Sequence, residues 1–571
     1  MSDRMIRVNM TSQTCEVVPF PDELKLLGGR ALSARILLDE CDASCDPLGP
    51  DNVLVLAPGV LSGTAAPTSG RISVGCKSPL TNGIKEANAG GEPGQHLMKL
   101  GYRVIVVTGA PADKDKRYAV EVDADGAKVI DATDTKGQWN YELCDGLSKK
   151  HTDKASFISI GPAGELQLKG ASVACTDQDN RYPTRHAARG GVGAVMGSKG
   201  LKYVAIEPGK ARVRRPEDKK QFGEIIKSYS KAYRDGPLMF KYGTSSVVPL
   251  ANQFNTFPTR NRIEGQSPDV ETLDGANIVK SFETNGGGMH NCMTGCIVQC
   301  SNVVHGADGK YKTSALEFET ITMLGANCGI ADVFDVADLD KLCDDIGLDT
   351  IETGAAVAVY MEADKLDWGN VEGTKSLLKE IAEGTEAGRA IGDGAEATGK
   401  KYGNKRIPTC KGQAIPAWDP RPLKATGVTY ATSPMGADHT AGLIVNPGLK
   451  PDEFPAASQT AQIINAVCDS SGFCQFLQPN ITNIADFYSA YHGETITPEQ
   501  MADQGWQCLV DEWTFNERAG LDESDDVLPQ CMLEDGIGPA NDVYDVDYEI
   551  AKQAKVKIPY TDATFSSAAS G

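Results

Sequence analysis

The sequence predicts an α+β protein in which a strand-rich N-terminal region precedes two mainly helical regions. Short β-branched runs bounded by Gly, Pro or Asp occur up to residue 208. From Lys219 onward, apolar residues recur at helical spacing. At 571 residues the chain exceeds the usual span of one hydrophobic core, so about two to four domains are expected. We expect three domains, at residues 1–208, 209–405 and 406–571.

Individual elements follow from local patterns. The runs that predict strands are 5–8, 52–57, 103–108 and 203–206. Helices are expected at 31–39 and 351–361, the second with Thr350 as its N-cap. Charged, proline-marked residues 210–218 are typical of a linker.

Composition narrows the function classes. The chain is 41% hydrophobic and 23% charged, as expected for a globular protein, and its net charge of −21 argues against nucleic-acid binding. The N-terminus lacks a secretory signal, and no apolar run approaches the roughly 20 residues that span a bilayer. We therefore expect a cytoplasmic protein without membrane insertion. Its sixteen cysteines should be free or metal-bound.

Glycine-rich loops that carry cations interrupt the N-terminal region. They include Arg30, Arg71, Lys77, Arg189 and Lys199. Glycine lets the backbone approach a ligand closely, and Arg provides bidentate phosphate contacts. The loops therefore predict a large, flat, phosphate-bearing cofactor. Dinucleotide and P-loop fingerprints are absent from the sequence, which makes NAD and ATP poor candidates.

Cys292, Cys296 and Cys300 form a close cysteine triplet, one ligand short of a [4Fe-4S] cube or a tetrahedral zinc site. An internal echo supplies a fourth thiol. Asp344, Gly347 and Asp349 have the same spacing as Asp469, Gly472 and Cys474. Two copies of one binding device imply two similar ligands, or one ligand with two-fold symmetry. Zinc remains an alternative, but a three-plus-one split of the cysteines favours a cluster.

These segments together resemble the aldehyde:ferredoxin oxidoreductase family of tungsten, occasionally molybdenum, bis-pyranopterin enzymes. The resemblance runs almost end to end, and the segments that carry it are 67–71, 77–80, 88–91, 189–199, 344–349 and the cysteine set. It implies an N-terminal β-sheet domain that forms the base beneath the cofactor, with two mainly α-helical domains above it. Two departures are a first cysteine gap one residue longer than in archaeal members and Phe473 in place of the usual Leu.

The resemblance also implies a binding set. Arg71, Asn88, Gly90 and Arg185 would handle the pterin phosphates and a linking Mg²⁺, with the carbonyls of Asn88 and His186 as Mg²⁺ ligands. Asp344, Asp349 and Asp469 would hold the pterin rings, and Cys474 would couple one pterin edge to the [4Fe-4S] cluster. The complete expected cofactor-binding set is Arg71, Asn88, Ala89, Gly90, Arg185, His186, Ala187, Asp344, Gly347, Leu348, Asp349, Asp469, Gly472, Phe473 and Cys474.

For the chemistry, Glu319 matches the family's carboxylate and His439 its catalytic histidine, with Glu317 an alternative to Glu319. The implied reaction is reversible oxidation of an aldehyde to a carboxylic acid, with electrons passing to ferredoxin or a small iron–sulfur subunit. A homodimer or a hetero-oligomer would suit the family. Two alternatives are a low-potential reductase of the benzoyl-CoA reductase type and a zinc-clipped scaffold without activity.

Overall fold

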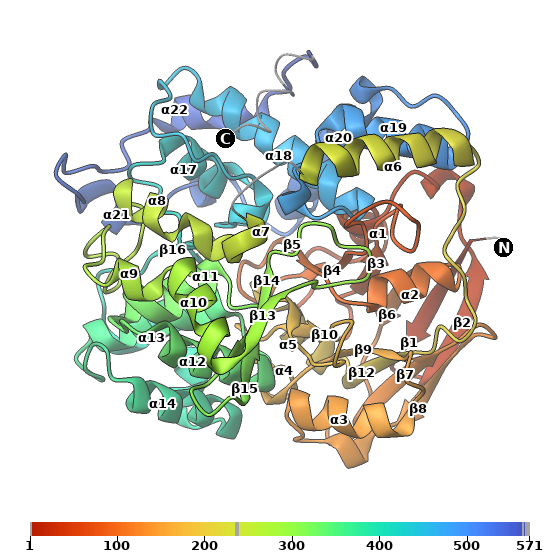
Figure 1. The fold of residues 1–571 in the computed structure, drawn as a ribbon, viewed down its shortest axis with the longest axis horizontal. Coiled ribbons are helices and arrows are strands. Elements are labelled where there is room, and N and C mark those ends of the chain that lie inside the picture. Colours follow the sequence, from red (N-terminus) through yellow and green to blue (C-terminus); the bar gives the residue numbers. More distant parts are fainter. Residues whose placement is uncertain (1–2, 235–238, 562–564, 566–571) are drawn as a thin grey trace.

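The computed structural model describes residues 3–234, 239–561 and 565 (Figure 1). It confirms the α+β class. The strand-rich N-terminal part lies on the right of the view, and the helical parts lie on the left and at the top. None of the helices in these ranges is long and apolar enough to cross a membrane.

The N-terminal region contains two six-stranded sheets of identical topology. The first has the order β2-β1-β6-β3-β4-β5 and the second the order β8-β7-β12-β9-β10-β11. In both, the initial hairpin pairs in parallel with the last strand, and the other pairings are antiparallel. The strands of the first sheet are β1 Arg4–Asn9, β2 Thr14–Pro19, β3 Leu54–Pro58, β4 Ile72–Lys77, β5 Ile84–Ala89 and β6 Tyr102–Thr108. Those of the second are β7 Tyr118–Val122, β8 Ala127–Asp131, β9 Ser156–Ser159, β10 Val173–Cys175, β11 Arg185–Ala187 and β12 Leu201–Ile206.

The two sheets share one core. Ile105 and Val107 of β6 pack with Ile158 and Val204 of the second sheet. Because side chains alternate along a strand, Val104 and Val106 point the other way and pack under helix α1 (Gly29–Glu40). Strands covered on both faces are continuously apolar, which explains why these runs were predictable. The other helices here are α2 Pro93–Lys99, α3 Asn140–Lys150, α4 Pro162–Glu165 and α5 Val192–Ser198.

The second region is mainly helical but holds a small antiparallel sheet of β13 (Gly287–His290), β14 (Ser301–His305) and β15 (Tyr311–Ser314). The cysteine triplet lies in the loop between β13 and β14 of this mainly helical region. Positive φ angles at Gly286 and Gly287 end helix α10 and start the hairpin. The helices are α6 Lys219–Arg234, α7 Met239–Tyr242, α8 Val248–Gln253, α9 Val270–Leu273, α10 Gly275–Asn285, α11 Phe318–Thr320, α12 Val333–Ile346, α13 Thr350–Glu362, α14 Val371–Glu383, α15 Glu386–Gly392 and α16 Ala395–Tyr402.

The third region packs two long helices onto the first sheet. Ala466 of α18 and Cys508 and Phe515 of α20 join the apolar cluster beneath α1. Its elements are β16 Thr409–Cys410, β17 Gln413–Ala414, α17 Lys424–Thr432, α18 Phe454–Ser471, α19 Ile481–His492, α20 Pro498–Arg518, α21 Gln530–Glu534 and α22 Tyr548–Ala551.

The predicted strands and helices are present, with ends within two residues of the expected ones. The N-cap of α13 differs: Asp349, not Thr350, caps this helix, because its Oδ1 accepts a hydrogen bond from the Ile351 N–H at 2.9 Å.

Candidate active site

The two echoed segments have the same local structure. Asp344 lies in the last turn of α12 and Asp469 in the last turn of α18. Gly347 and Gly472 then end these helices with φ angles of 82° and 90°, a left-handed conformation that suits glycine. The repeat predicted from the sequence is therefore a pair of equivalent helix ends.

Each helix end rests on one of the two sheets. The backbone of Gly472 meets Gly59, which follows β3, and that of Gly347 meets Gly161, which follows the equivalent strand β9. A Cβ atom on Gly59 would lie 2.1 Å from the Gly472 nitrogen, so the contact requires glycine. The duplicated sheets thus hold two similar helix ends.

A corresponding pair of contacts joins the strand ends below. Arg71, just before β4, donates from Nε to Asn88 Oδ1 and from Nη2 to the Asn88 carbonyl at 3.3 Å. Ser172, just before β10, lies 2.7 Å through its Oγ from Nδ1 of His186. Asn88 and His186 therefore occupy equivalent positions in the two sheets.

The His186 ring also contacts one of the carboxylates. Its Nε2 lies 3.1 Å from Asp344 Oδ1 and 2.8 Å from the Pro183 carbonyl. The other oxygen, Asp344 Oδ2, is buried without a hydrogen-bond partner in the described part of the chain. The side chain of His186, expected to act only through its backbone, therefore orients Asp344.

The other two aspartates differ. Asp349 uses one oxygen to cap α13 and places the other 3.3 Å from Arg189 Nε. Burial, together with the Glu86 carboxylate, raises the pKa of Asp469 well above its usual range. A protonated Asp469 can donate a hydrogen bond as well as accept one.

Cys296, Cys300 and Cys474 belong to one apolar cluster that draws residues from all three regions, and Cys292 packs against it. Arg71 connects them to the strand ends, since its Nη1 lies 3.8 Å from Cys474 Sγ. A Cβ on Gly90 would lie 3.4 Å from Cys292 Sγ, so this strand end also faces the triplet. The structure therefore brings Cys474 to the triplet, with Arg71 and Gly90 beside them.

Burial affects the charge of these thiols. It raises the pKa of Cys300 and Cys474, whereas a hydrogen bond from Cys292 lowers the pKa of Cys296. In residues 3–234, 239–561 and 565, no three His, Cys, Asp or Glu side chains converge tightly enough for one metal ion. Four thiols in one apolar cluster are a donor set that either zinc or an iron–sulfur cluster can use.

Glu319 and His439 face each other from different regions. Glu319 lies in the short helix α11, just before a π-helical turn (Ile321–Gly325), and its Oε2 accepts the Ala417 N–H at 2.7 Å. Its Oε1 lies 3.8 Å from Nδ1 of His439, and both atoms are buried without a hydrogen-bond partner among the described residues. Such atoms are rare in folded proteins, so they mark where another polar group fits.

Glu317 points to different neighbours. Its Oε2 accepts a hydrogen bond from Thr244, and it lies near the sulfurs of Cys300 and Cys474. Burial raises its pKa, although Thr244 and Arg185 oppose the shift. Of the two acids, Glu319 is the one beside His439.

A buried ion pair supports His439 and was missed in the sequence. Lys85 of β5 binds Asp438, the residue before His439. Burial alone would raise the pKa of Asp438, but Lys85, Arg189 and His439 lower it, so the carboxylate stays ionised. The sequence did contain a signal for this pair. Lysine is rarely fully buried unless it is paired, so Lys85 within a strand that is buried on both faces predicts an acidic partner.

Several loop cations expected at phosphates have protein partners instead. Arg30 forms a bidentate pair with Glu512 at 2.8 Å, and Arg189 binds Asp349 and two carbonyls. Lys77 and Lys199 donate to loop carbonyls. Burial explains the difference, because a buried cation must be paired. Arg71 and Arg185 remain near the cysteines; Arg185 donates to Ser301 and Ser314, while its Nε has no hydrogen-bond partner among the described residues.

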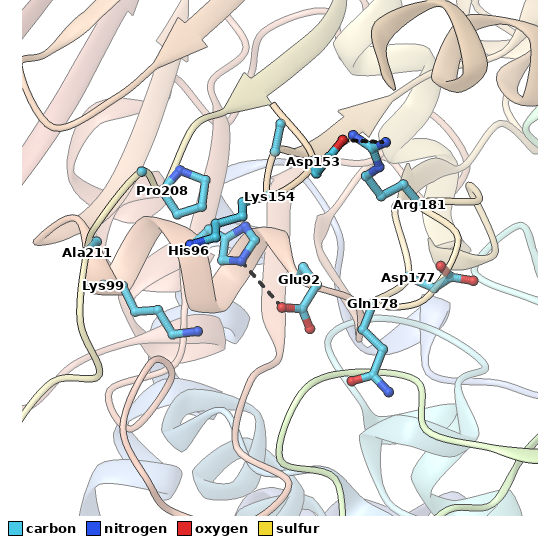
Figure 2. A pocket seen from close by; sticks show the side chains of 12 residues that line it. Glu92, His96, Lys99, Asp153, Lys154, Asp177, Gln178, Arg181, Pro208 and Ala211 are labelled. Atoms are coloured by element: carbon cyan, nitrogen blue, oxygen red, sulfur yellow. Dashed lines mark ion pairs between the residues drawn. The ribbon is translucent and has the colours of Figure 1, made fainter. Parts of the chain in front are cut away.

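A polar cavity of about 290 Å³ lies outside this site (Figure 2). Glu92 and His96 form an ion pair in its wall, and Glu92 Oε1 accepts the Thr294 N–H of the cysteine loop at 2.7 Å. Lysines, an arginine and aspartates complete the lining, which does not suit a flat cofactor. Glu92, in the wall of this cavity, therefore holds the cysteine loop through the Thr294 N–H.

Comparison with known proteins places these features in a family. Residues 5–208 match the model for the N-terminal domain of aldehyde ferredoxin oxidoreductase, and residues 223–554 match the model for its domains 2 and 3. The tungsten-containing aldehyde ferredoxin oxidoreductases of Pyrococcus furiosus and Thermococcus kodakarensis are each 32% identical, over 93% of this chain and 91% of theirs.

One more distant sequence relative and one solved structure extend the comparison. An aliphatic sulfonate oxidoreductase WOR-like subunit of Pyrococcus furiosus is 27% identical over 87% of this chain and 83% of its own. The active site complex BamBC of benzoyl coenzyme A reductase, solved with 1,5-dienoyl-CoA, has a TM-score of 0.81. It is 19% identical and covers 96% of this chain and 92% of that one, a likeness of fold alone.

Proposed function

The chain belongs to the aldehyde ferredoxin oxidoreductase family, which includes the tungsten-containing enzymes of Pyrococcus furiosus and Thermococcus kodakarensis, and from this premise we propose that it oxidises aldehydes to carboxylic acids. The proposed cofactors are a tungsten or molybdenum bis-pyranopterin, a [4Fe-4S] cluster and Mg²⁺. The electron acceptor would be a ferredoxin or a small iron–sulfur subunit. The observation that carries the proposal is the Glu319–His439 pair, because its two facing atoms are buried and unpartnered.

The donor set fits these groups. Cys292, Cys296, Cys300 and Cys474 would hold the cluster, since thiolates are its usual ligands. Asp344, with one oxygen oriented by His186 and the other unpartnered, suits the donors of a pterin ring. The carbonyls of Asn88 and His186, at equivalent strand positions, would bind Mg²⁺, which prefers oxygen ligands.

The bound metal would supply two-electron redox chemistry and oxygen activation. The chain supplies the proton handling. Glu319 Oε1 is free to take a proton from water, while the Ala417 N–H holds Oε2 in place. His439 would donate a hydrogen bond to the carbonyl oxygen of the aldehyde. Asp438, kept ionised by Lys85, holds the segment that carries His439.

Metal analysis and an aldehyde assay test the proposal together. The expected content is about four Fe and one W or Mo per chain, with aldehyde-dependent reduction of a viologen dye. A purified chain that contains zinc but neither iron nor tungsten or molybdenum would refute the proposed oxidoreductase activity. A metal-replete chain that is inactive on every aldehyde would refute this substrate class and favour the low-potential reductase.

A cysteine variant tests the fourth ligand. Cys474→Ser should lower the iron content, with Cys468→Ser as control, because Cys468 lies in α18 outside the expected ligand set. A normal iron count in Cys474→Ser would show that Cys474 is not a ligand.

A further inference from the structure

Helix α6 covers the cysteine cluster with one face. Phe222, Ile225, Ile226, Tyr229 and Tyr233 recur at helical spacing and pack into the apolar cluster that contains Cys296, Cys300 and Cys474. The helix lies at the surface, across α19 and α20 in the view of Figure 1. It therefore covers these cysteines on one side, and each of them is at most 8% exposed.

The same helix is fastened to the segment that follows Cys474. Tyr229 donates to the Leu477 carbonyl at 2.8 Å and Tyr233 to the Phe476 carbonyl at 3.1 Å. The Phe476 residue, two positions after Cys474, is 38% exposed. A large apolar side chain thus reaches the surface beside α6, connected through a short stretch of backbone to a cluster cysteine.

The outer face of α6 is basic. Lys220, Lys227 and Lys231 are exposed at intervals of seven and four residues, which places them opposite the packed face. No ion-pair partner is found for these three in the described ranges. Residues 210–231 carry a net charge of +5 in a chain whose net charge is −21. Glu224 is the acid on this face.

We propose that the outer face of α6, together with Phe476, is the docking surface for a small acidic one-electron carrier protein. Most of this acidic chain would repel such a carrier, so a local basic face orients it. Phe476, exposed beside α6, provides the apolar part of the contact.

The inference rests on the proposed function for its redox step. In each encounter one electron passes from the reduced iron–sulfur group to the oxidised carrier, without bond formation or proton transfer. Oxidation of one aldehyde releases two electrons and therefore reduces two carriers.

The test uses the full-length enzyme and an oxidised acidic [4Fe-4S] ferredoxin as the probe. The docking variant combines Lys220→Gln, Lys227→Gln and Lys231→Gln. The control variant combines Lys128→Gln, Lys149→Gln and Lys400→Gln, three exposed lysines on other elements that remove the same charge. At about 50 mM salt, where screening is weak, the docking variant should bind the ferredoxin roughly tenfold less tightly, and the control should bind like the wild type.

Two further measurements sharpen the result. At high salt the difference between the variants should disappear, whereas Phe476→Ser should weaken binding at both salt concentrations because an apolar contact is not screened. Carbodiimide coupling, which joins lysines to carboxylates, should link the ferredoxin to Lys220, Lys227 or Lys231. Equal binding by the docking and control variants, or coupling only to other lysines, would overturn the proposal. So would a docking variant that converts an oligomer to a monomer, because α6 would then contact a second copy.

A viologen-linked aldehyde assay separates this inference from the proposed function. Both lysine variants should keep wild-type viologen reduction, because this small mediator needs no docking surface. If the wild type oxidised no aldehyde, the proposed substrate would be refuted. The ferredoxin affinities of the docking and control variants would still decide whether α6 is the docking surface.

Discussion

Oε1 of Glu319 lies 3.8 Å from Nδ1 of His439, and neither atom has a hydrogen-bond partner among the described residues. The pair is held from outside: the Ala417 N–H fixes the glutamate, and the Lys85–Asp438 pair fixes the segment that carries the histidine. Both atoms are therefore free to form hydrogen bonds with a reacting group that lies beside them.

Glu319→Gln should lower kcat for aldehyde oxidation at least about 100-fold, because general acid–base groups contribute about 10² to 10⁴. The glutamine retains the shape and can still accept from Ala417, so W and Fe content should be normal. Metal analysis beside steady-state kinetics checks this. Loss of metal with activity would assign Glu319 a structural role.

Glu317→Gln is the matched substitution at the neighbouring acid. Glu317 faces Thr244 and the cysteines rather than His439. The amide can still accept the Thr244 hydrogen bond, so kcat should remain within about tenfold of wild type, well short of the loss expected at a general base. If Glu317→Gln were the more damaging of the two, the assignment of the base would be reversed.

His186→Ala should weaken retention of the pterin cofactor. The substitution removes the ring that orients Asp344 and leaves a second buried carboxylate oxygen unpartnered. Loss of such a supporting contact typically costs about 10- to 100-fold in affinity for the bound group. The readouts are tungsten per chain and fluorescence of released pterin after dialysis.

Ser172→Ala provides the graded control, because it removes only the contact at Nδ1 of the ring. Its cofactor loss should lie between those of wild type and His186→Ala. Full retention in His186→Ala would show that the ring does not position Asp344.

Local signals explain which parts of the site were predictable. In both 344–349 and 469–474 an Asp is followed three residues later by a Gly that ends a helix. Such a glycine can be recognised from a few neighbouring residues, so these helix ends were predictable. The partner of Arg30 has no such signature: Glu512 is 482 residues away in the chain. Arg30 was therefore assigned to a phosphate, although its charge is neutralised within the fold. The contact of His186 with Asp344 and that of Lys85 with Asp438 were hidden for the same reason.

Glu512→Gln should destabilise the protein by about 3 kcal/mol, because the buried Arg30 loses its bidentate partner and keeps only Asp469, whose Oδ2 lies 3.9 Å from Nη1. Glu40→Gln is the control, since its pair with Arg7 lies at the surface and should contribute less than about 1 kcal/mol. Urea unfolding midpoints compare the two. The double variant Arg30→Met, Glu512→Leu should recover much of the loss, since an apolar pair can replace a buried ion pair. Equal, small losses in both single variants would show that Arg30 is solvated.

His492, at the end of α19, should make the fold sensitive to mild acid. Burial, reinforced by Arg103, lowers its pKa to about 4, and its Nε2 has no partner in the described part of the chain. In the unfolded chain the ring titrates near 6.5. Between pH 6.5 and pH 4 the unfolded state therefore binds a proton that the folded state does not, so stability falls as the pH falls.

The loss should be about 2 kcal/mol, since each pKa unit corresponds to about 1.4 kcal/mol and partial exposure of the ring reduces the effect. His492→Phe keeps the aromatic contacts with Tyr488 and Tyr491 and removes the titrating group. Urea unfolding at pH 7 and pH 5 measures both proteins. The wild type should lose more stability than the variant between pH 7 and pH 5. Equal losses in the two proteins would show that the pKa of His492 is not lowered by folding.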